Sequence, residues 1–364
     1  MKAGIVGLPN VGKSTLFNCL SNTKAQSANF PFCTIEPNHS IINVPDKRLM
    51  TLEDIVKPEK VIPATVEIVD IAGLVKGASK GEGLGNKFLA NIRETDAIIH
   101  VLRCFDNDNI THVDGSVDPV RDKEIIDIEL QLKDLESLNN RIEKVNRTAK
   151  SGDKDALREK EILQKAIAFI ESSNNIRSID LDIADINKYL KPLQLITSKP
   201  VLYVCNVDEN SINSTNDHVE SVKSLISKEG ANLIVLAAGI ESEINELDDY
   251  EERRMFLDDL GLDIPGSSKL INATYDLLNL QTYFTAGPKE VRAWTIKKMA
   301  TAPQAAGVIH TDFEKGFIKA EVISYNDYIN FKTEAKVKEA GKMRVEGKDY
   351  IVKNGDIIHF LFNV

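Results

Sequence analysis

The 364-residue sequence predicts an α/β domain that carries a helical insertion and is followed by a small β-rich domain. Three observations lead to this fold class. A glycine-rich segment, Gly7–Ser14, lies between a short apolar strand and a helix. About a hundred residues separate the core strands at 97–102 and 200–205, whereas a strand–helix–strand unit needs only about 30. From Gln281 onward, short strand-like segments replace the helix–strand alternation.

The segment Gly7–Ser14 matches the phosphate-loop pattern G-x-x-x-x-G-K-[ST]. Gly7 and Gly12 let the backbone curl so that its N–H groups face an anion, and the following helix adds the positive end of its dipole. Lys13 is predicted to reach the β- and γ-phosphates, and the Ser14 hydroxyl to ligate Mg²⁺. A glycine-rich turn that fits by chance is the alternative. The predicted phosphate-binding residues are Asn10, Val11, Gly12, Lys13, Ser14 and Thr15.

A second motif follows the apolar strand at 66–70, which ends in an acid. In Asp70-x-x-Gly73 the carboxylate is predicted to support Mg²⁺ through water, and the Gly73 N–H to sense the γ-phosphate. A capped turn is the alternative reading. Thr34, in a proline-containing loop between the first helix and the next strand, is the predicted second Mg²⁺ ligand. Leu74 stands where Ras-type GTPases carry a water-positioning glutamine, which predicts slow turnover or a different catalytic group.

The insertion, at about 121–198, is predicted to be an antiparallel helical hairpin of the coiled-coil type. Residues 151–153 (Ser-Gly-Asp) break the pattern between its two helices. The region 141–160 near the break holds 7 basic and 4 acidic side chains, and either a solvated helix end or an RNA contact explains that charge. The apolar series expected to be buried are Ile125, Ile128, Leu132, Leu135 and Ile142 in the first helix, and Ile162, Leu163, Ala166, Ile167 and Ile170 in the second.

The segment Asn206–Glu209 directly follows the strand at 200–205, where a guanine-specific protein carries Asn-Lys-x-Asp. Val207 replaces the lysine and Glu209 replaces the aspartate that accepts two guanine hydrogen bonds. Because a glutamate is one methylene longer, it would crowd or miss that edge of guanine. Asn206 and Glu209 are predicted to border the adenine, and Ala238, after the strand at 233–236, to close over the base. Asn206, Val207, Glu209 and Ala238 are therefore the predicted base-binding residues. Asp208 leaves guanine recognition open, because a one-residue change of register would let its carboxylate reach guanine.

Composition and charge limit the classes of protein to which this chain can belong. A net charge of −10 argues against a protein that binds nucleic acid by bulk charge. No apolar run approaches the ~20 residues of a membrane span, and four scattered cysteines indicate a reducing compartment, so a cytoplasmic protein is expected. The segment from Gln281 carries a net charge of +3, from 13 basic and 10 acidic side chains. It is predicted to be β-rich, with one helix at 301–309 and a terminal hairpin of strands 349–352 and 356–362.

Taken together, these motifs resemble the YchF/Obg-like ATPase family of translation-factor P-loop proteins over essentially the full length. The resemblance rests on Gly7–Thr15, the glycine-rich segment Asp70–Gly85, Asn206–Glu209 and the C-terminal segment from Gln281. It implies a P-loop NTPase sheet of the G-domain type in residues 1–280 and a TGS domain, a ubiquitin-like β-grasp module, in residues 281–364. It also implies ATP preference and association with the ribosome, and it matches Asn10 to the asparagine that helps to hold K⁺ in potassium-stimulated relatives.

The leading interpretation is therefore a slow, Mg²⁺-dependent ATPase that hydrolyses ATP to ADP and phosphate and acts as a nucleotide switch. Lys13, Asn10 and Gly73 are the predicted catalytic residues, Ser14, Thr34 and Asp70 hold the metal, and the ribosome or ribosomal RNA is the predicted partner. We expect a monomer that does not bind membranes. Two alternatives remain: a conventional Obg-type GTPase, and a nucleotide-gated ribosome- or RNA-binding regulator whose hydrolysis is incidental.

Overall fold

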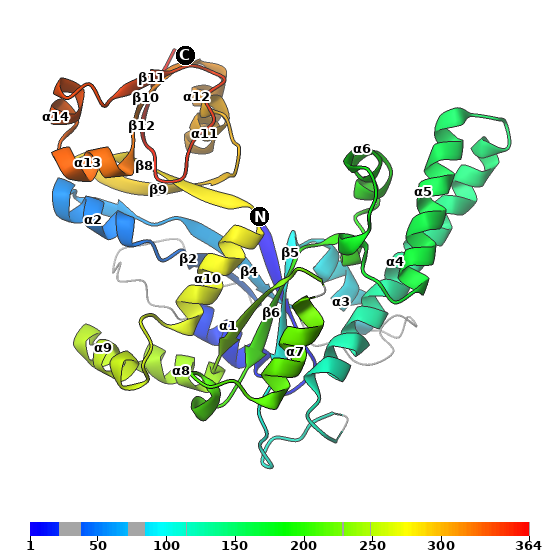
Figure 1. Cartoon of the computed structure of the whole chain (residues 1–364). Coiled ribbons are helices and arrows are strands. Elements are labelled where there is room, and N and C mark those ends of the chain that lie inside the picture. The colour runs from blue at the N-terminus through cyan, green and yellow to red at the C-terminus, as the bar shows by residue number, and fades with distance from the viewer. Residues whose placement is uncertain (22–37, 72–83, 114, 228, 248, 364) are drawn as a thin grey trace. The chain divides into compact units, whose positions relative to one another are not determined.

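The computed structural model describes residues 1–21, 38–71, 84–113, 115–227, 229–247 and 249–363 (Figure 1). The predicted site residues Thr34 and Gly73, and also Leu74, lie outside these ranges. Contacts divide the chain into two compact units. The first comprises the described residues of Met1–Thr23, Ile35–Ser40 and Glu67–Leu270, and the second includes Ile41–Val66 and the chain from Ile271 onward. The second unit thus takes in an N-terminal segment that a boundary at residue 280 leaves in the first domain.

The first unit is built on a six-stranded sheet of order β2-β4-β1-β5-β6-β7. The strands from β4 to β7 in that order pair in parallel. β1 lies between β4 and β5, so the segment after β1 leaves the middle of the sheet. The strand bounds are β1 Lys2–Val6, β2 His39–Asn43, β4 Thr65–Asp70, β5 Ala97–Arg103, β6 Val201–Asn206 and β7 Asn232–Leu236. Each corresponds to an apolar segment that the sequence predicts to be a strand.

Helices flank this sheet (Figure 1). α1 begins at Lys13, directly after the glycine-rich segment, and buries Leu16, Cys19 and Leu20. No helix of the described ranges is both long and apolar enough to cross a membrane. The helices are α1 Lys13–Ser21, α3 Leu84–Arg93, α4 Pro119–Ala149, α5 Lys154–Glu171, α6 Ile183–Asp185, α7 Asp217–Ser227, α8 Ala238–Glu246, α9 Tyr250–Asp259 and α10 Gly266–Leu277, and short helical turns occupy Ile176–Ser178, Ile186–Leu190, Lys191–Leu193, Ile196–Ser198 and Glu209–Ser211.

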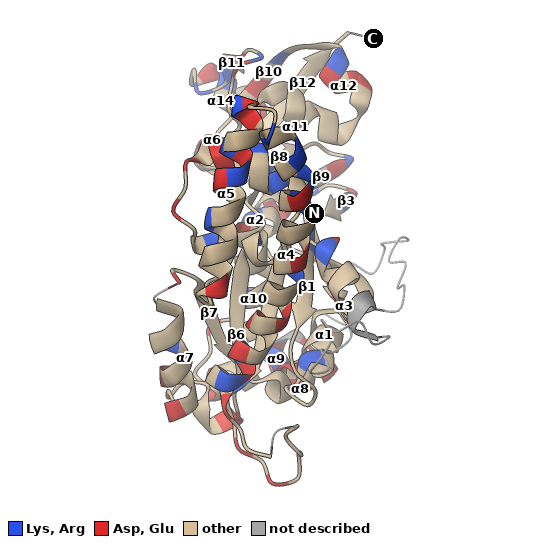
Figure 2. Ribbon diagram, turned by 90° about the vertical axis from the view of Figure 1, so that its right-hand side faces the viewer, with Lys and Arg blue, Asp and Glu red and all other residues tan. Residues whose placement is uncertain are grey.

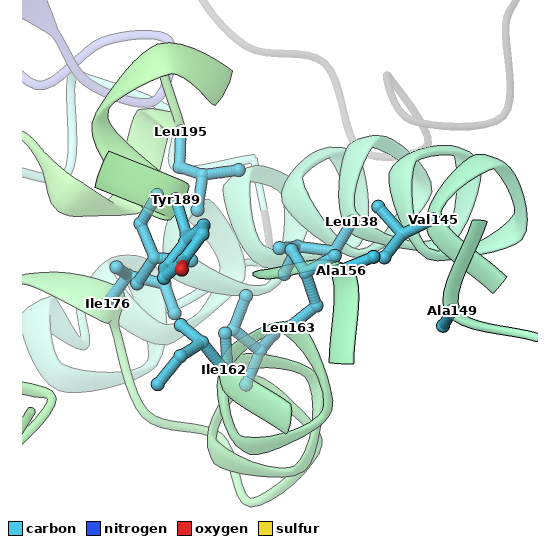
Figure 3. Packing of buried hydrophobic residues seen from close by; sticks show 12 residues of the cluster. Leu138, Val145, Ala149, Ala156, Ile162, Leu163, Ile176, Tyr189 and Leu195 are labelled. Atoms are coloured by element: carbon cyan, nitrogen blue, oxygen red, sulfur yellow. The ribbon is translucent and has the colours of Figure 1, made fainter. Parts of the chain in front are cut away.

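The long helices α4 and α5 form the predicted insertion between β5 and β6. Asp118 caps α4, whose first residue is Pro119, and Asp153 caps α5 after the turn at Ser151–Gly152. Figure 3 shows the apolar side chains that join the two helices, with Tyr189 and Leu195 from the segment that returns to the sheet. This cluster contains the predicted α5 residues Ile162, Leu163, Ala166 and Ile170.

The predicted series on α4 is only partly correct. Leu135 and Ile142 pack against the cluster, but Ile128 and Leu132 are 50% and 44% exposed. The buried positions are Ile126, Leu130, Leu138, Val145 and Ala149. α4 carries apolar residues on neighbouring positions around 125–132, so several helical stripes fit the sequence. The elements that pack on α4 decide which stripe is buried.

The second unit has its own six-stranded sheet, of order β11-β10-β12-β8-β9-β3. β8 pairs antiparallel with β9, and β12 pairs parallel with β8 and antiparallel with β10. β3 comes from the N-terminal half of the chain and pairs parallel with β9. The elements are α2 Lys47–Val56, β3 Lys60–Ile62, β8 Leu280–Ala286, β9 Glu290–Lys297, α11 Ala302–Ile309, α12 Thr311–Lys315, β10 Phe317–Ile323, α13 Tyr325–Phe331, α14 Glu334–Glu339, β11 Arg344–Glu346 and β12 Ile357–Phe362.

Two predictions about this unit are wrong. Residues 349–352 form no strand beyond a single bridge between Ile351 and Thr301, so there is no terminal hairpin. The Asp356 carboxylate holds that segment in a turn instead, since it accepts hydrogen bonds from the Lys353 N–H at 2.9 Å and the Tyr350 hydroxyl at 2.7 Å. The described part of the C-terminal segment also contains α12, α13 and α14 besides the predicted helix at 301–309.

His100 lies in the middle of β5, a strand whose residues are all buried. Its side chain is buried, and Nε2 has no hydrogen-bond partner among the described residues. Burial lowers the pKa of His100 from 6.5 to about 3, the charges of Lys123 and Arg177 act in the same direction, and Glu229 opposes them. This places His100 in the core as a neutral structural histidine, as its apolar strand predicts.

We expect stability to fall as the pH drops from 6.5 towards 3, because the unfolded state then binds a proton that the folded state excludes. Between pH 6.5 and 5 this amounts to about 2 kcal/mol in the free energy of unfolding. His100→Leu should remove that part of the pH dependence in urea unfolding at pH 7 and pH 5. His359→Gln, at an exposed position of β12, is the control and should leave it unchanged. An unaltered pH dependence in His100→Leu would reject this origin.

Candidate functional site

The predicted site residues that the structure describes lie at one edge of the first sheet. In a parallel sheet the carboxyl ends of all strands meet at the same edge, which is where ligands bind in open α/β folds. The glycine-rich loop follows β1, Asp70 ends β4, Asn206 ends β6, and Ala238 begins the helix after β7. Residues far apart in sequence are thereby collected around one loop.

The loop has the backbone conformation of a phosphate cradle. Asn10 and Gly12 adopt positive φ angles of 64° and 90°, a region that suits Gly and Asn better than other residues. Leu16 N–H donates to the Gly12 carbonyl at 2.9 Å, so α1 starts directly after the loop. Ser14 and Thr15 are exposed at the N-terminus of this helix, where unpaired N–H groups and the helix dipole favour an anion.

Lys13 and Asp70 contact each other at the ends of adjacent strands. The Lys13 ammonium donates a hydrogen bond to the Asp70 carboxylate, and the two side chains are only 10% and 12% exposed. Asp70 pairs in register with Ile5 of β1, which explains why it lies beside the loop that follows β1. Hydroxyl and carboxylate oxygens are hard ligands of the kind that Mg²⁺ takes, so the side-chain chemistry of Ser14 and Asp70 fits this ion.

The Asn206 side chain is hydrogen-bonded to the glycine-rich loop and to the start of α8. Its side-chain amide donates to the Val11 carbonyl at 2.9 Å and accepts from the Ala238 N–H at 2.9 Å. Gly12 is the residue that allows this approach, because a Cβ at position 12 would lie 2.2 Å from the Asn206 amide nitrogen. Asn206 is 4% exposed. Its polar groups therefore hold the loop to β6 and α8, and the amide group of Ala238 is committed to the same contact.

The other residues of the altered base motif are arranged differently. Val207 is 3% exposed and donates its N–H to Leu236 in β7. The Asp208 carboxylate accepts from the Ser211 N–H at 3.0 Å and so caps the short turn that follows. Glu209, the first residue of this turn, is exposed. Glu209 is thus the acidic group of the motif whose carboxylate is not engaged within the described structure.

Sequence reasoning missed a second support of the loop, which comes from β5. The Asn10 side chain donates to the Thr111 carbonyl at 3.0 Å. The segment that presents Thr111 is held by Arg103, the last residue of β5. The only signal in the sequence was a single charged residue, Arg103, at the end of a mostly apolar run.

A parallel sheet with a phosphate loop at its centre, and an acidic side chain at the end of the adjacent strand, defines a P-loop nucleoside-triphosphate-binding protein. A family model described as 50S ribosome-binding GTPase matches residues 2–140. A second model, YchF-GTPase_C, described as a protein of unknown function, matches residues 280–363.

The relatives place the chain more narrowly. It is 58% identical to the ribosome-binding ATPase YchF of Pasteurella multocida, over 100% of this chain and 99% of that protein. It is 54% identical to the protein of the same name from Bacillus subtilis, over 100% of both chains. The solved structure of the Schizosaccharomyces pombe YchF GTPase is 39% identical and has a TM-score of 0.90. The match covers 99% of this chain and 97% of that chain. The chain belongs to the YchF family.

Proposed function

We propose that this chain is a ribosome-associated, Mg²⁺-dependent ATPase of the cytoplasm that acts, as a monomer, as a slow nucleotide switch. The observation that carries the proposal is the contact of Lys13 with Asp70 at the mouth of a phosphate loop with left-handed residues. The two side chains are nearly buried, so charge in this place acts through a medium of lower dielectric than water. The names of the relatives in Pasteurella multocida and Bacillus subtilis support ribosome association and ATP hydrolysis.

In this proposal Lys13 leaves Asp70 and binds the β- and γ-phosphates when nucleotide enters, and the loop N–H groups hold the phosphates. Ser14, Thr34 and Asp70 would hold Mg²⁺, which would neutralise charge on the phosphate oxygens. The Gly73 N–H reports the γ-phosphate. Asn10 holds K⁺, since its Nδ2 is used by Thr111 and its amide oxygen is left as an acceptor. Catalysis then rests on positioning and electrostatic stabilisation.

The preference for adenine rests on Glu209. The names of the relatives differ, since the Pasteurella multocida protein is called an ATPase and the Schizosaccharomyces pombe protein a GTPase. Equilibrium binding of ATP and of GTP to the purified chain, each with Mg²⁺, tests the proposal directly. Tighter binding of GTP would replace it with the conventional GTPase.

Glu209→Asp should raise the affinity for GTP relative to ATP about fivefold, which corresponds to one hydrogen bond of ~1 kcal/mol. The shorter carboxylate is the group that accepts from guanine in Asn-Lys-x-Asp proteins. We do not include Val207→Lys, because Val207 is buried and a lysine there carries a cost of desolvation. Asp208→Asn is the control and should leave the ratio unchanged, since Asp208 caps the turn at Ser211. A ratio that shifts only in Asp208→Asn would assign base recognition to Asp208.

We further propose that residues 281–364 form a TGS domain of the β-grasp type. In support, β8 and β12, the first and last strands of this segment, lie parallel and adjacent in the sheet. The antiparallel partners β9 and β10 flank them. Ala302, Ala305 and Ala306 of α11 are buried in one apolar cluster with side chains of this sheet.

The coiled-coil hairpin of α4 and α5 offers an RNA contact at its tip. Along the hairpin most basic residues are paired: Arg141 with Glu159 at 2.6 Å, and Lys165 with Glu161 at 2.7 Å. Figure 2 shows basic and acidic residues interspersed along α5. Around the turn the pairing stops. The exposed basic residues without an ion pair to any described residue are Lys144, Arg147, Lys150 and Lys154.

Stabilisation of the helices does not explain all four of these unpaired basic residues. Lys154 is the first residue of α5, where a cation faces the positive end of the helix dipole. Phosphates of RNA are anions that this tip can bind. If hydrolysis is incidental and the chain is mainly a binding protein, the tip would carry the function. Turnover measured with and without ribosomes separates a coupled switch, which ribosomes stimulate, from such a regulator.

Arg147→Glu with Lys150→Glu should weaken co-sedimentation with ribosomes roughly tenfold at low salt, and the difference should shrink as salt rises. ATP affinity should not change, because the tip lies far from the phosphate loop in the sequence and makes no contact with it among the described residues. The matched control, Lys133→Glu with Lys165→Glu, reverses two paired charges on the same helices and should have little effect. Equal loss in both double variants would show that overall charge, and not the tip, matters.

A further inference from the structure

Arg103 is a buried cation with an uncommon set of partners. It is 1% exposed and forms no ion pair with a described carboxylate. Its guanidinium instead donates to three backbone carbonyls, those of Phe105 at 3.1 Å, Asn107 at 3.2 Å and Ile110 at 2.9 Å. The Phe105 ring stacks beneath it, with 4.8 Å between the guanidinium carbon and the ring centroid. One side chain thus holds three carbonyls of the segment 105–110, because the planar guanidinium of arginine presents donors in several fixed directions.

That segment ends at the contact with the phosphate loop. Thr111, directly after Ile110, presents its carbonyl to Asn10 Nδ2 at 3.0 Å. On the other side, His112 Nε2 lies 2.8 Å from the buried Asp122 carboxylate at the start of α4. The Thr111 carbonyl is therefore fixed between two anchors. Because this carbonyl takes the amide nitrogen of Asn10, the amide oxygen of Asn10 is directed elsewhere, as an acceptor.

The two supports of the loop come from one pair of residues. Arg103 and Asn206 are partners in the register of β5 and β6. Asn206 holds the Val11 carbonyl directly, and Arg103 acts on the neighbouring residue, Asn10, through Thr111. Asn10 has a φ of 64°, so its side chain projects from a turn that needs such support to keep one orientation.

We propose that Arg103 is a positioning residue of the nucleotide site, which sets the orientation of the Asn10 side chain through the Thr111 carbonyl. The inference rests on the proposed function in one respect, since the amide oxygen of Asn10 is assigned there to K⁺ at the nucleotide site, and turnover is therefore measured with K⁺ present. Arg103 itself touches no nucleotide. Its effect on turnover passes through Asn10, and this dependence is what the experiment measures.

A double-mutant cycle tests the dependence. Arg103→Lys keeps the charge but cannot reach three carbonyls, and Asn10→Ala removes the side chain that is positioned. Each single variant should lower kcat/KM for ATP roughly tenfold, and the double variant should fall no further than about tenfold, because groups that act as one unit are not additive. Independent effects would multiply to about a hundredfold and overturn the proposal. An Asn10→Ala variant with parental kcat/KM would overturn it too, since nothing would then be positioned.

Arg177→Lys is the control, at an arginine whose side chain is 12% exposed. Arg177 contacts Thr197 and Tyr203 away from the loop, so this variant should lower the melting temperature and leave kcat/KM unchanged. If Arg103→Lys does not fold, Phe105→Leu removes the ring beneath the guanidinium and keeps its hydrogen bonds, and the cycle is repeated with this milder change. A parent chain that binds neither ATP nor GTP would reject the proposed function by itself. If the parent binds only GTP, the same cycle with GTP tests Arg103 separately.

Discussion

Lys13→Ala is expected to reduce kcat/KM for ATP by roughly 10- to 150-fold, the equivalent of losing a charge-assisted contact of about 1.5–3 kcal/mol. Lys13 is the cation of the phosphate-loop motif, and it contacts the Asp70 carboxylate. Because both side chains are about nine-tenths buried, alanine also leaves Asp70 without its partner. A lower melting temperature should therefore accompany the loss of turnover.

The two consequences can be separated. Lys13→Ala combined with Asp70→Asn removes the uncompensated carboxylate, so the melting temperature should recover while turnover stays low. Ser14→Ala should weaken binding of ATP with Mg²⁺ far more than binding of ATP with EDTA, since its hydroxyl is assigned to the metal. If Lys13→Ala hydrolysed ATP at the parental rate, the assignment of the loop as the phosphate site would be wrong.

Gly12→Ala should abolish measurable ATP binding and lower stability by about 3 kcal/mol, the sum of strain and two lost hydrogen bonds. Position 12 has a φ of 90°, and its Cβ would lie 2.2 Å from the Asn206 amide nitrogen. Asn206 would have to leave Val11 and Ala238, which both rely on it. Urea unfolding and equilibrium binding measure the two effects.

Gly152→Ala is the control for the backbone alone. Gly152, in the turn between α4 and α5, also has a positive φ, 82°, but a Cβ added there would meet no described atom within 4 Å. The substitution should cost about 1 kcal/mol of stability and leave ATP affinity unchanged. Equal effects of the two variants on ATP affinity would show that the contact between Gly12 and Asn206 has no part in nucleotide binding.

The sequence by itself determined the parts of this protein whose signals are local. Residues 7–14 identify a phosphate loop by themselves, because the glycine spacing and the start of the following helix are both local features of the sequence. The apolar runs at β5 and β6 specify buried parallel strands, since both faces of such strands are covered. The long interval between these strands, with its helical periodicity, specified the insertion of α4 and α5.

Tertiary structure decided those features for which the local sequence allows more than one arrangement, namely the buried face of α4 and the pairing of β12. α4 has more than one apolar stripe, so packing chose Ile126 and Leu130 over Ile128 and Leu132. β12 could have paired with residues 349–352, but it lies between β8 and β10. The segment before β12 is instead held in a turn by the Asp356 carboxylate. The pairing of a strand depends on residues that are distant in sequence, which periodicity cannot rank.

The hydrogen bonds that support the phosphate loop were also decided by the tertiary structure. Val11 and Asn206 are 195 residues apart, and Asn10 and Thr111 are 101 apart. The sequence pointed to Asn206 only because it stands in a motif, and it assigned that residue to the base rather than to the loop carbonyl. It assigned no role to Arg103. Hydrogen bonds from side chains to backbone carbonyls leave little trace in sequence, because every residue supplies the same acceptor, and only the folded chain decides which carbonyl comes within reach.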